Sequence, residues 1–345
     1  MKRIAARLLL LAGALALVAA VAGCGSSKKS SSSASATGGA AGSGGKIALI
    51  AYSTPKEAYA ELIPGFQKTS AGRGVTFTQS YGASGDQSRA VDGGLHADVV
   101  AFSLEPDVTR LVKDGIVASN WSANPHRGIV TDSVVALAVR KGNPKHITGW
   151  NDLVKPGVKI VTPNPFTSGG ARWNIMGAYG SQIAQGKSPA EAQAFLAKLL
   201  KNVVVQDKSA RDALQTFSGG KGDVLISYEN EAITAQQKKV ALDYVVPQQT
   251  ILIENPIAVT KTASKPSAAF VNYLYTPAAQ TIFAKKGYRP VVSGITGPYK
   301  FPKPSGLFTI QKFGGWTVVT KKFFDPQSGI VAQIERKLGV STASG

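Results

Sequence analysis

Residues 162–173 read TPNPFTSGGARW, between an apolar run at 158–161 and a stretch at 171–179 that suits a helix. This order places the hydroxyl of Ser168 and two glycines where a strand turns into a helix. The first N–H groups of a helix have no partner within it, and the helix dipole is positive there. Glycine lets an anion approach those groups, and Ser168 adds a hydroxyl donor. The segment predicts one wall of an oxyanion site, although Ser-Gly-Gly alone is more often a helix cap followed by a loop.

Three further polar turns share this position between a predicted strand and a predicted helix. They are Ser53–Glu57, in which Ser53 or Thr54 is expected to cap the helix, Tyr81–Gln87 and Lys208–Asp212. Each turn alone is typical of a cap or a loop. In open α/β sheets, however, ligands bind beyond the carboxyl ends of the strands. Four helix N-termini that converge from two lobes therefore predict a small anion surrounded by N–H donors.

Short apolar strands alternate with helical stretches along the rest of the chain. This alternation predicts an α/β fold with helices on the faces of the sheets. The length of the chain suits two lobes, each with its own core. The chain is expected to cross between them near 133–143 and again near 248–260. The predicted strands are 47–51, 75–79, 97–101, 133–140, 159–161, 203–206 and 224–227, followed by extended segments at 251–253 and 257–259. The predicted helices include 56–69, 86–93, 106–113, 171–179, 189–201 and 211–217.

The N-terminal residues predict the compartment. A basic start precedes an apolar run at 8–22, which has the length of a signal peptide and is too short for a typical membrane span. The run ends in Val21-Ala22-Gly23-Cys24, which resembles a bacterial lipobox, so Cys24 is expected to carry lipid and to become the first mature residue. Cleavage at another position is the alternative. Cys24 is the only cysteine, which excludes intrachain disulfides and cysteine-based catalytic or metal sites.

The expected organisation follows from these signals. Residues 1–23 form a lipoprotein signal peptide, and residues 24–45, which are rich in Ser, Gly and Ala, form a flexible tether. Residues 46–138 form the first part of lobe 1 and residues 139–250 form lobe 2. Residues 251–345 return to lobe 1 and add C-terminal helices.

Charge and side-chain chemistry narrow the class of function. With 39 Lys and Arg against 20 Asp and Glu, the formal charge is +19, yet no nucleic-acid-binding motif is present and much of the charge is expected on a solvated face near an anionic surface. His96, His126 and His146 are scattered and have no metal-ligand spacing. No Walker loop, nucleophile elbow or dinucleotide fingerprint occurs. We expect no catalysis, no cofactor and no metal. An extracytoplasmic phosphate or sulfate ester hydrolase and a structural or adhesive lipoprotein remain alternatives.

Several segments together carry a family resemblance over residues 47–338. They are Tyr81–Gly85, Ala97–Val100, Val139–Lys145, Thr162–Trp173, Gly222–Ile226, Glu229–Ala232, Tyr273–Pro277, Gly287–Pro290 and Phe313–Trp316. In this order they resemble the sulfate-binding proteins of the sulfate/thiosulfate ABC importers. The resemblance implies a two-lobed, type II periplasmic-binding-protein-like fold. Each lobe would have a mixed sheet flanked by helices, and the ligand would lie in the cleft between the lobes.

In that family the dianion is dehydrated and held mainly by backbone N–H groups. The resemblance implies a hydroxyl donor at Ser168, and backbone donors at Gly169, Gly170, Ser53, the Ser84 turn and Ala210. Tyr228 stands where the family has an indole, so it would donate from a shorter ring. Two further departures are Ser53, at a usual aspartate, and Phe166, at a common lysine.

Two arginines follow these turns closely. We expect Arg172 and Arg211 to hold the loops from behind rather than to touch the ligand, although plain surface arginines are an equal alternative.

The donor set favours sulfate over phosphate. Sulfate carries no proton at neutral pH, so its site needs donors only, whereas hydrogen phosphate benefits from a carboxylate acceptor. The nearest carboxylate in sequence, Asp86, is expected in the first turn of a helix. Thiosulfate and molybdate or tungstate remain alternative ligands. The predicted protein is a monomer, anchored by lipid to the extracytoplasmic side of the cell membrane, that closes on sulfate and delivers it to the permease subunits of an ABC importer.

Overall fold

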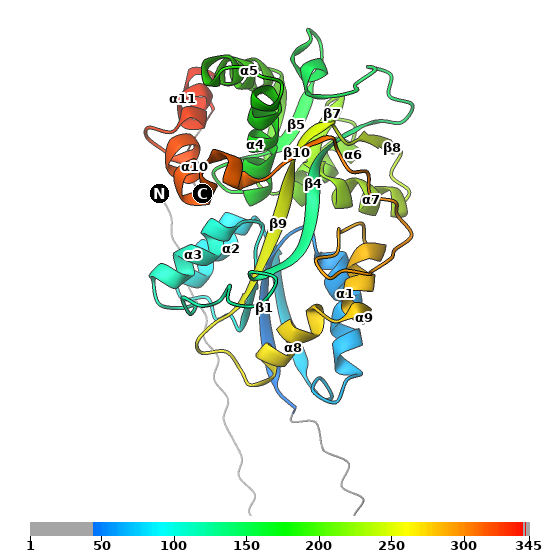
Figure 1. The fold of residues 1–345 in the computed structure, drawn as a ribbon, viewed down its shortest axis with the longest axis vertical. Coiled ribbons are helices and arrows are strands. Elements are labelled where there is room, and N and C mark those ends of the chain that lie inside the picture. The colour runs from blue at the N-terminus through cyan, green and yellow to red at the C-terminus, as the bar shows by residue number, and fades with distance from the viewer. Residues whose placement is uncertain (1–43, 341, 343–345) are drawn as a thin grey trace, which may run out of the picture. The chain divides into compact units, whose positions relative to one another are not determined.

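The computed structural model describes residues 44–340 and 342 (Figure 1). The expected signal peptide, Cys24 and nearly all of the tether lie outside the described residues. Within the described part, the strands form one ten-stranded sheet, in which eight strands follow the order β2-β1-β3-β9-β4-β7-β5-β6, while β10 pairs with β9 and β8 pairs with β4. Helices flank this sheet on both sides, which confirms the predicted α/β class. Among residues 44–340, no helix is long and apolar enough to cross a membrane.

Lobe 1 is built on the first three strands and part of β9. The parallel strands are β1 (Lys46–Tyr52), β2 (Thr76–Gly82) and β3 (Val99–Ala101), and β9 (Gln249–Val259) pairs antiparallel with β3. Tyr59 and Phe66 of the first helix pack with Phe270 and Phe283 in its core. Its helices are α1 (Lys56–Gln67), α2 (Ser84–Asp92), α3 (Glu105–Lys113), α8 (Pro266–Leu274) and α9 (Pro277–Lys285).

Lobe 2 repeats the arrangement of strand, polar turn and helix. Its parallel strands are β5 (Ile160–Pro163), β6 (Val203–Asp207) and β7 (Val224–Tyr228), and β8 (Leu242–Val245) pairs with β4. Its helices are α4 (Gly169–Ala184), α5 (Pro189–Lys201), α6 (Ala210–Ser218) and α7 (Glu229–Gln237), with a short 3₁₀ turn, η1 (Trp150–Val154).

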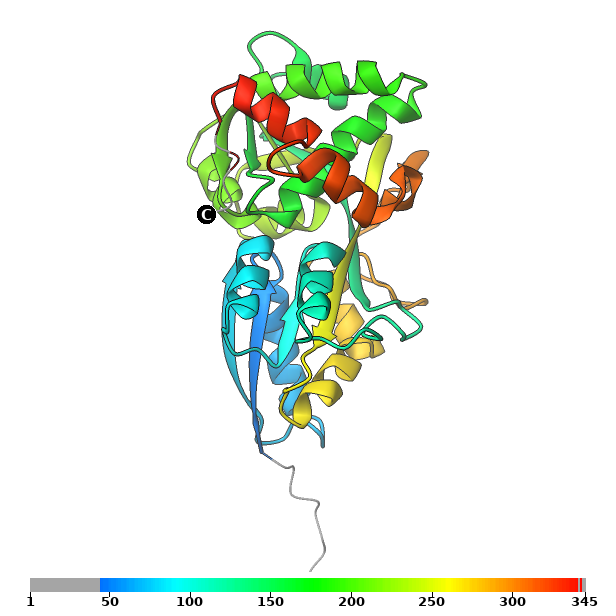
Figure 2. The ribbon, with the colours of Figure 1, turned by 90° about the vertical axis from the view of Figure 1, so that its left-hand side faces the viewer.

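Two long strands connect the lobes. The strand β4 (Ile129–Arg140) pairs with β9 along its first half, where Ser133 is opposite Ile253, and with β7 along its second half. The strand β9 pairs with β4 in one part and with β3 of lobe 1 in another. Figures 1 and 2 show both strands running from one lobe into the other. They form a two-stranded hinge.

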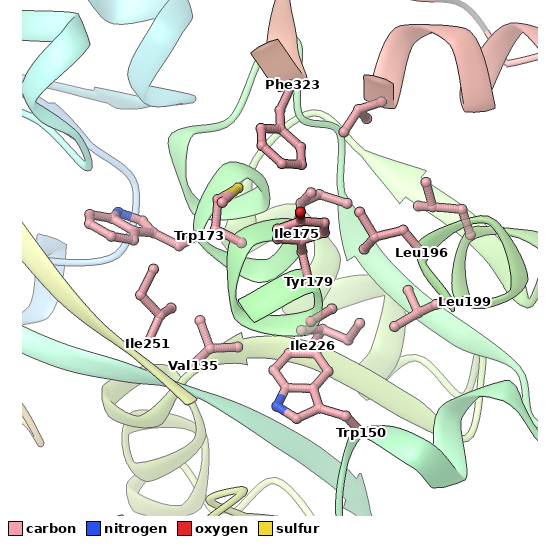
Figure 3. Packing of buried hydrophobic residues seen from close by; sticks show 14 of the residues in the cluster. Val135, Trp150, Trp173, Ile175, Tyr179, Leu196, Leu199, Ile226, Ile251 and Phe323 are labelled. Carbon is pink, nitrogen blue, oxygen red and sulfur yellow. The ribbon is translucent and has the colours of Figure 1, made fainter. Parts of the chain in front are cut away.

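The C-terminal segment packs against lobe 2. It contains β10 (Gly306–Phe308), η2 (Ile310–Phe313), α10 (Gly315–Phe324) and α11 (Ile330–Lys337). Trp316 of α10 meets Trp173 of α4 edge to face, with ring centroids 4.7 Å apart. Figure 3 shows Ile175 and Tyr179 of α4 in the same buried cluster as Phe323.

Helix α4 is therefore buried almost all round, and this fixes the position of its N-terminus. At Gly180 a Cβ would lie 2.3 Å from the ring of Phe308, so glycine is required for the close approach of β10 to the helix. The helix begins at Gly169 and ends at Ala184, which is longer than the predicted 171–179. The extra turns are stabilised by burial rather than by strong local helix propensity.

Candidate functional site

Polar turns from both lobes meet where the lobes touch. The helices α1, α2, α4 and α6 each begin within one of the four predicted turns, and α7 begins after Tyr228. The backbone N–H of Gly85 in α2 donates to the carbonyl oxygen of Thr167, just before α4, at 3.1 Å. Since these residues belong to different lobes, the structure describes a conformation in which the lobes are in contact.

Four of the expected binding residues form one cluster in lobe 2. A Cβ placed on Gly170 would lie 3.4 Å from Ser168 Oγ, and 3.5 Å from both the Cβ of Ala210 and the Cε1 of Tyr228. Ser168, Ala210 and Tyr228 are all buried. The starts of α4, α6 and α7 thus bring their first N–H groups to one place.

Gly169 connects this cluster to lobe 1. A Cβ on Gly169 would lie 2.7 Å from Ser103 Oγ, so the two lobes are in direct contact there. The backbone N–H of Ser103 donates to Ser84 Oγ at 2.9 Å. Ser84 is therefore connected through Ser103 to the start of α4, where residues Ser168–Gly170 form what we call the cradle.

The Ser53 turn lies beside the starts of α2 and α6. Ser53, Ala83 and Ser209 line one cavity of about 450 Å³. The expected cap at this turn is wrong, because Pro55 occupies the cap position of α1 and no side chain caps the helix. The hydroxyl of Thr54 instead forms a hydrogen bond of 3.1 Å with the hydroxyl of Tyr288.

Two serines at helix starts use their hydroxyls differently. Ser84 Oγ donates to Asp107 Oδ2 at 2.5 Å and accepts from Ser103, so its backbone N–H is the group that remains for a ligand. Ser168 occupies the N-cap position of α4 but makes no capping hydrogen bond with its side chain. The first N–H groups of α4 have no acceptor within the helix. The cradle therefore offers a hydroxyl and backbone donors together.

Arg211 lies behind the α6 turn. Its guanidinium donates to Glu57 Oε2 at 2.8 Å, to Glu231 Oε1 at 2.9 Å and to the carbonyl oxygen of Thr54 at 3.1 Å. Burial raises the pKa of Glu231, and the charge of Arg211 opposes this effect. The guanidinium thereby ties α6 and α7 of lobe 2 to α1 of lobe 1.

Arg172 makes a different set of contacts. Its Nε donates to the carbonyl oxygen of Pro165 at 2.9 Å, and its guanidinium lies over the ring of Phe324 at 5.1 Å. These contacts attach the loop before α4 to the C-terminal helix α10.

The carboxylates around the cradle have partners of their own. Asp86 is in the first turn of α2, as expected, and it pairs with Arg89 and, at 3.0 Å, with Lys208 of lobe 2. Asp107 accepts from Ser84. Over the described residues, no group of three or more His, Cys, Asp or Glu side chains is arranged to hold a metal ion. The geometry suits a ligand that accepts hydrogen bonds and carries negative charge.

Sequence reasoning missed Ser103 and two side chains that bond to it. Trp173 Nε1 and Asn255 Nδ2 both donate to the carbonyl oxygen of Ser103, at 2.9 and 3.1 Å. The available signal was the same as for the other turns, because Ser103 follows the strand at 99–101 and precedes the helix at 105–113.

Two α/β lobes joined by two hinge strands, with a buried cluster of donors between them, define a solute-binding protein. The model of the bacterial extracellular solute-binding protein family matches residues 47–289. A sulfate-binding protein from Synechococcus elongatus is 45% identical over 292 residues, which are 81% of this chain and 83% of that protein. A thiosulfate-binding protein from Escherichia coli K12 is 37% identical over 79% of this chain and 86% of its own length.

Among solved structures, the sulfate-binding protein SubI from Mycobacterium tuberculosis H37Rv is similar with a TM-score of 0.78 and 42% identity. The match covers 81% of this chain and 99% of SubI. The chain therefore belongs to the bacterial extracellular solute-binding proteins and, within them, to the family of the sulfate-binding proteins.

Proposed function

We propose that this protein captures sulfate outside the cytoplasm and delivers it to the permease of an ABC importer. The observation that carries the proposal is the meeting of several helix N-termini with the Ser168 hydroxyl at a buried site between the lobes. Helix N-termini bind anions through backbone N–H groups and the helix dipole. The names of the most similar relatives support the same ligand class.

The proposed donors follow the cluster described above. In lobe 2 they are the hydroxyls of Ser168 and Tyr228 and the backbone N–H groups of Gly169, Gly170 and Ala210. In lobe 1 they are the backbone N–H groups at Ser53 and Ser84. Arg172 and Arg211 act as supports, because their contacts are with loops and carboxylates.

The proposed specificity rests on proton chemistry. A fully ionised dianion is matched by donors, whereas a protonated oxyanion needs an acceptor for its hydrogen. The two carboxylates beside the Ser84 turn, Asp86 and Asp107, are engaged with Lys208, Arg89 and Ser84. Sulfate and thiosulfate both satisfy this condition, and hydrogen phosphate does not.

Calorimetric titration of the purified protein with sulfate, thiosulfate, molybdate and phosphate tests the proposal. We expect sulfate to bind most tightly and phosphate to bind much more weakly. Ser168→Ala should weaken sulfate binding about tenfold, since one charge-assisted hydrogen bond is lost, without changing the unfolding midpoint. Tight binding of phosphate or molybdate, together with no response to sulfate, would contradict the assignment of sulfate as the ligand.

We also propose that the chain is a monomer held at the membrane by lipid on Cys24. The support is the lipobox-like sequence Val21-Ala22-Gly23-Cys24 after the apolar run. Metabolic labelling with radioactive palmitate should label the wild type and leave Cys24→Ala unlabelled, as followed by immunoprecipitation. A wild type that takes up no label would contradict lipid anchoring at this residue.

A further inference from the structure

Ser103 lies at the junction of several elements that build the site. It is buried, between β3 and α3 of lobe 1. Its backbone N–H donates to Ser84, and its carbonyl oxygen accepts from Trp173 of α4 and from Asn255 of the hinge strand β9. Its hydroxyl forms a hydrogen bond of 2.6 Å with the hydroxyl of Tyr228 in lobe 2. One serine therefore joins lobe 1, the hinge, the cradle helix and Tyr228.

The direction of the Ser103–Tyr228 hydrogen bond decides where the Tyr228 proton points. Each hydroxyl can donate once and can also accept. Among the described residues, Tyr228 is the one hydrogen-bond partner of Ser103 Oγ. A buried hydroxyl proton without an acceptor is unfavourable, so whichever of the two hydroxyls accepts needs a further acceptor for its own proton. An anion in the cradle next to Tyr228 would be that acceptor if Ser103 donates to Tyr228.

The surroundings of Tyr228 keep its phenol protonated. Burial raises the pKa of Tyr228 well above its ordinary value, while hydrogen bonding by Ser103 and Asn255 acts in the opposite sense. The ring of Tyr228 also packs against Gly170, next to the Ser168 hydroxyl. A phenol proton directed away from Ser103 can therefore face the cradle.

We propose that Ser103 is a positioning residue that directs the Tyr228 proton towards the bound anion and thereby makes the site select sulfate over hydrogen phosphate. The inference rests on the proposed function. A phenol that already accepts from Ser103 is a stronger donor, because hydrogen bonds in a chain polarise one another. Without the Ser103 hydroxyl, the O–H bond of Tyr228 is free to rotate. A lone pair of the phenol oxygen can then accept the proton of hydrogen phosphate. An indole N–H at this position would need no such partner, because it can only donate.

The test measures the dissociation constants of sulfate and phosphate at pH 8 for the wild type, Ser103→Ala, Tyr228→Phe and the double variant. Ser103→Ala should weaken sulfate binding about tenfold, the effect of losing one oriented donor. It should weaken phosphate binding less, or strengthen it, so that the preference for sulfate over phosphate becomes smaller. In the Tyr228→Phe background, Ser103→Ala should have no further effect on sulfate, because its action runs through Tyr228.

A matched control is Ser181→Ala, which removes an equally buried hydroxyl within lobe 2, where Ser181 Oγ donates to Ala178 at 2.7 Å. It should leave the sulfate-to-phosphate ratio unchanged. If Ser103→Ala does not fold, Ser103→Cys keeps a similar shape with a weak donor. This variant should also reduce the preference for sulfate over phosphate.

Two results would overturn the inference. One is an equal loss of affinity for sulfate and phosphate, which would mean that Ser103 acts only on contact between the lobes. The other is a full Ser103→Ala effect in the Tyr228→Phe background, which would mean that the two residues act independently. A wild type that binds no sulfate would overturn the proposed function itself, and the inference with it.

Discussion

At the scale of single residues, the site depends on how closely the backbones of the two lobes approach. Gly169 begins α4, and the space beside its Cα is occupied by Ser103 and Leu104 of lobe 1. A side chain at this position would meet Ser103 Oγ at 2.7 Å and Leu104 Cγ at 2.9 Å. Real Cβ atoms do not tolerate such distances, so lobe contact in this conformation requires a glycine.

Gly169→Ala should therefore weaken sulfate binding by more than about tenfold, because the lobes cannot close fully over the anion. The lobes themselves should fold normally, since the new methyl group projects into the space between them. Calorimetric titration with sulfate, together with circular dichroism, measures both effects.

The matched control is Gly149→Ala, because a Cβ at Gly149 would have no neighbour within 4 Å and its extended backbone suits alanine. Sulfate affinity should be unchanged in this variant. Wild-type affinity in Gly169→Ala would show that the contact between Gly169 and Ser103 is not needed for binding.

At the scale of elements, an ion network fastens α1 of lobe 1 to α6 and α7 of lobe 2. Glu57 of α1 accepts from Arg211 of α6 and pairs with Lys238 at the end of α7. Burial raises the pKa of Glu57, but hydrogen bonds from Arg211 and Lys238 outweigh it and lower the pKa to about 2. A carboxyl group whose pKa is lowered by its partners stabilises the paired state. This stabilisation is fully present at pH values above the ordinary pKa of the carboxyl group. That stabilisation disappears as the pH falls through the lowered value.

The network predicts a pH dependence of lobe closure. At pH 7 the Glu57→Gln variant should bind sulfate about two- to fivefold more weakly than the wild type, a modest effect because the pair is partly exposed to solvent. The difference should persist down to pH about 4.5 and shrink progressively between pH about 4.5 and about 2. Titrations of both proteins across this pH range measure it.

Glu61→Gln is the control for the same helix. Glu61 pairs with Lys286, which follows α9, so both partners belong to lobe 1 and the pair does not bridge the lobes. This variant should bind sulfate as the wild type does at every pH. An equal effect of the two substitutions would argue against a specific role of the Glu57 network in closure.

At the scale of the whole molecule, two strands carry the chain between lobes while other contacts hold the lobes together. The hinge strands β4 and β9 pair with each other and reach into both sheets. Opening the lobes would break the bonds from Trp173 to Ser103 and from Gly85 to Thr167. Those bonds form only when the donors of both lobes surround one volume, so ligand binding and closure are coupled.

Sulfate should therefore reduce the radius of gyration of the protein in solution, as measured by small-angle X-ray scattering. The amide of Gly85 should exchange its hydrogen more slowly in the presence of sulfate, because its acceptor belongs to the other lobe. Gly169→Ala should show neither change at the same sulfate concentration. A radius of gyration that is unaffected by saturating sulfate would contradict capture by hinge closure.

The local sequence predicted the elements that position the site. Each of the four polar turns is followed by a helix, and the α/β class is confirmed, because turn chemistry and strand patterns act over a few residues. The resemblance supplied the list of binding residues. The chain could be assigned to its family on these signals alone.

Other features depended on the tertiary structure. Ser103 and Tyr228 are 125 positions apart, and no local pattern indicates that their hydroxyls meet. The hydroxyl of Ser84 turns to Asp107, and α4 extends to Ala184 under the C-terminal helices, because of packing between distant segments. Turns and helix starts are determined by neighbouring residues, whereas the partner of a buried hydroxyl is determined by which surfaces the fold brings together.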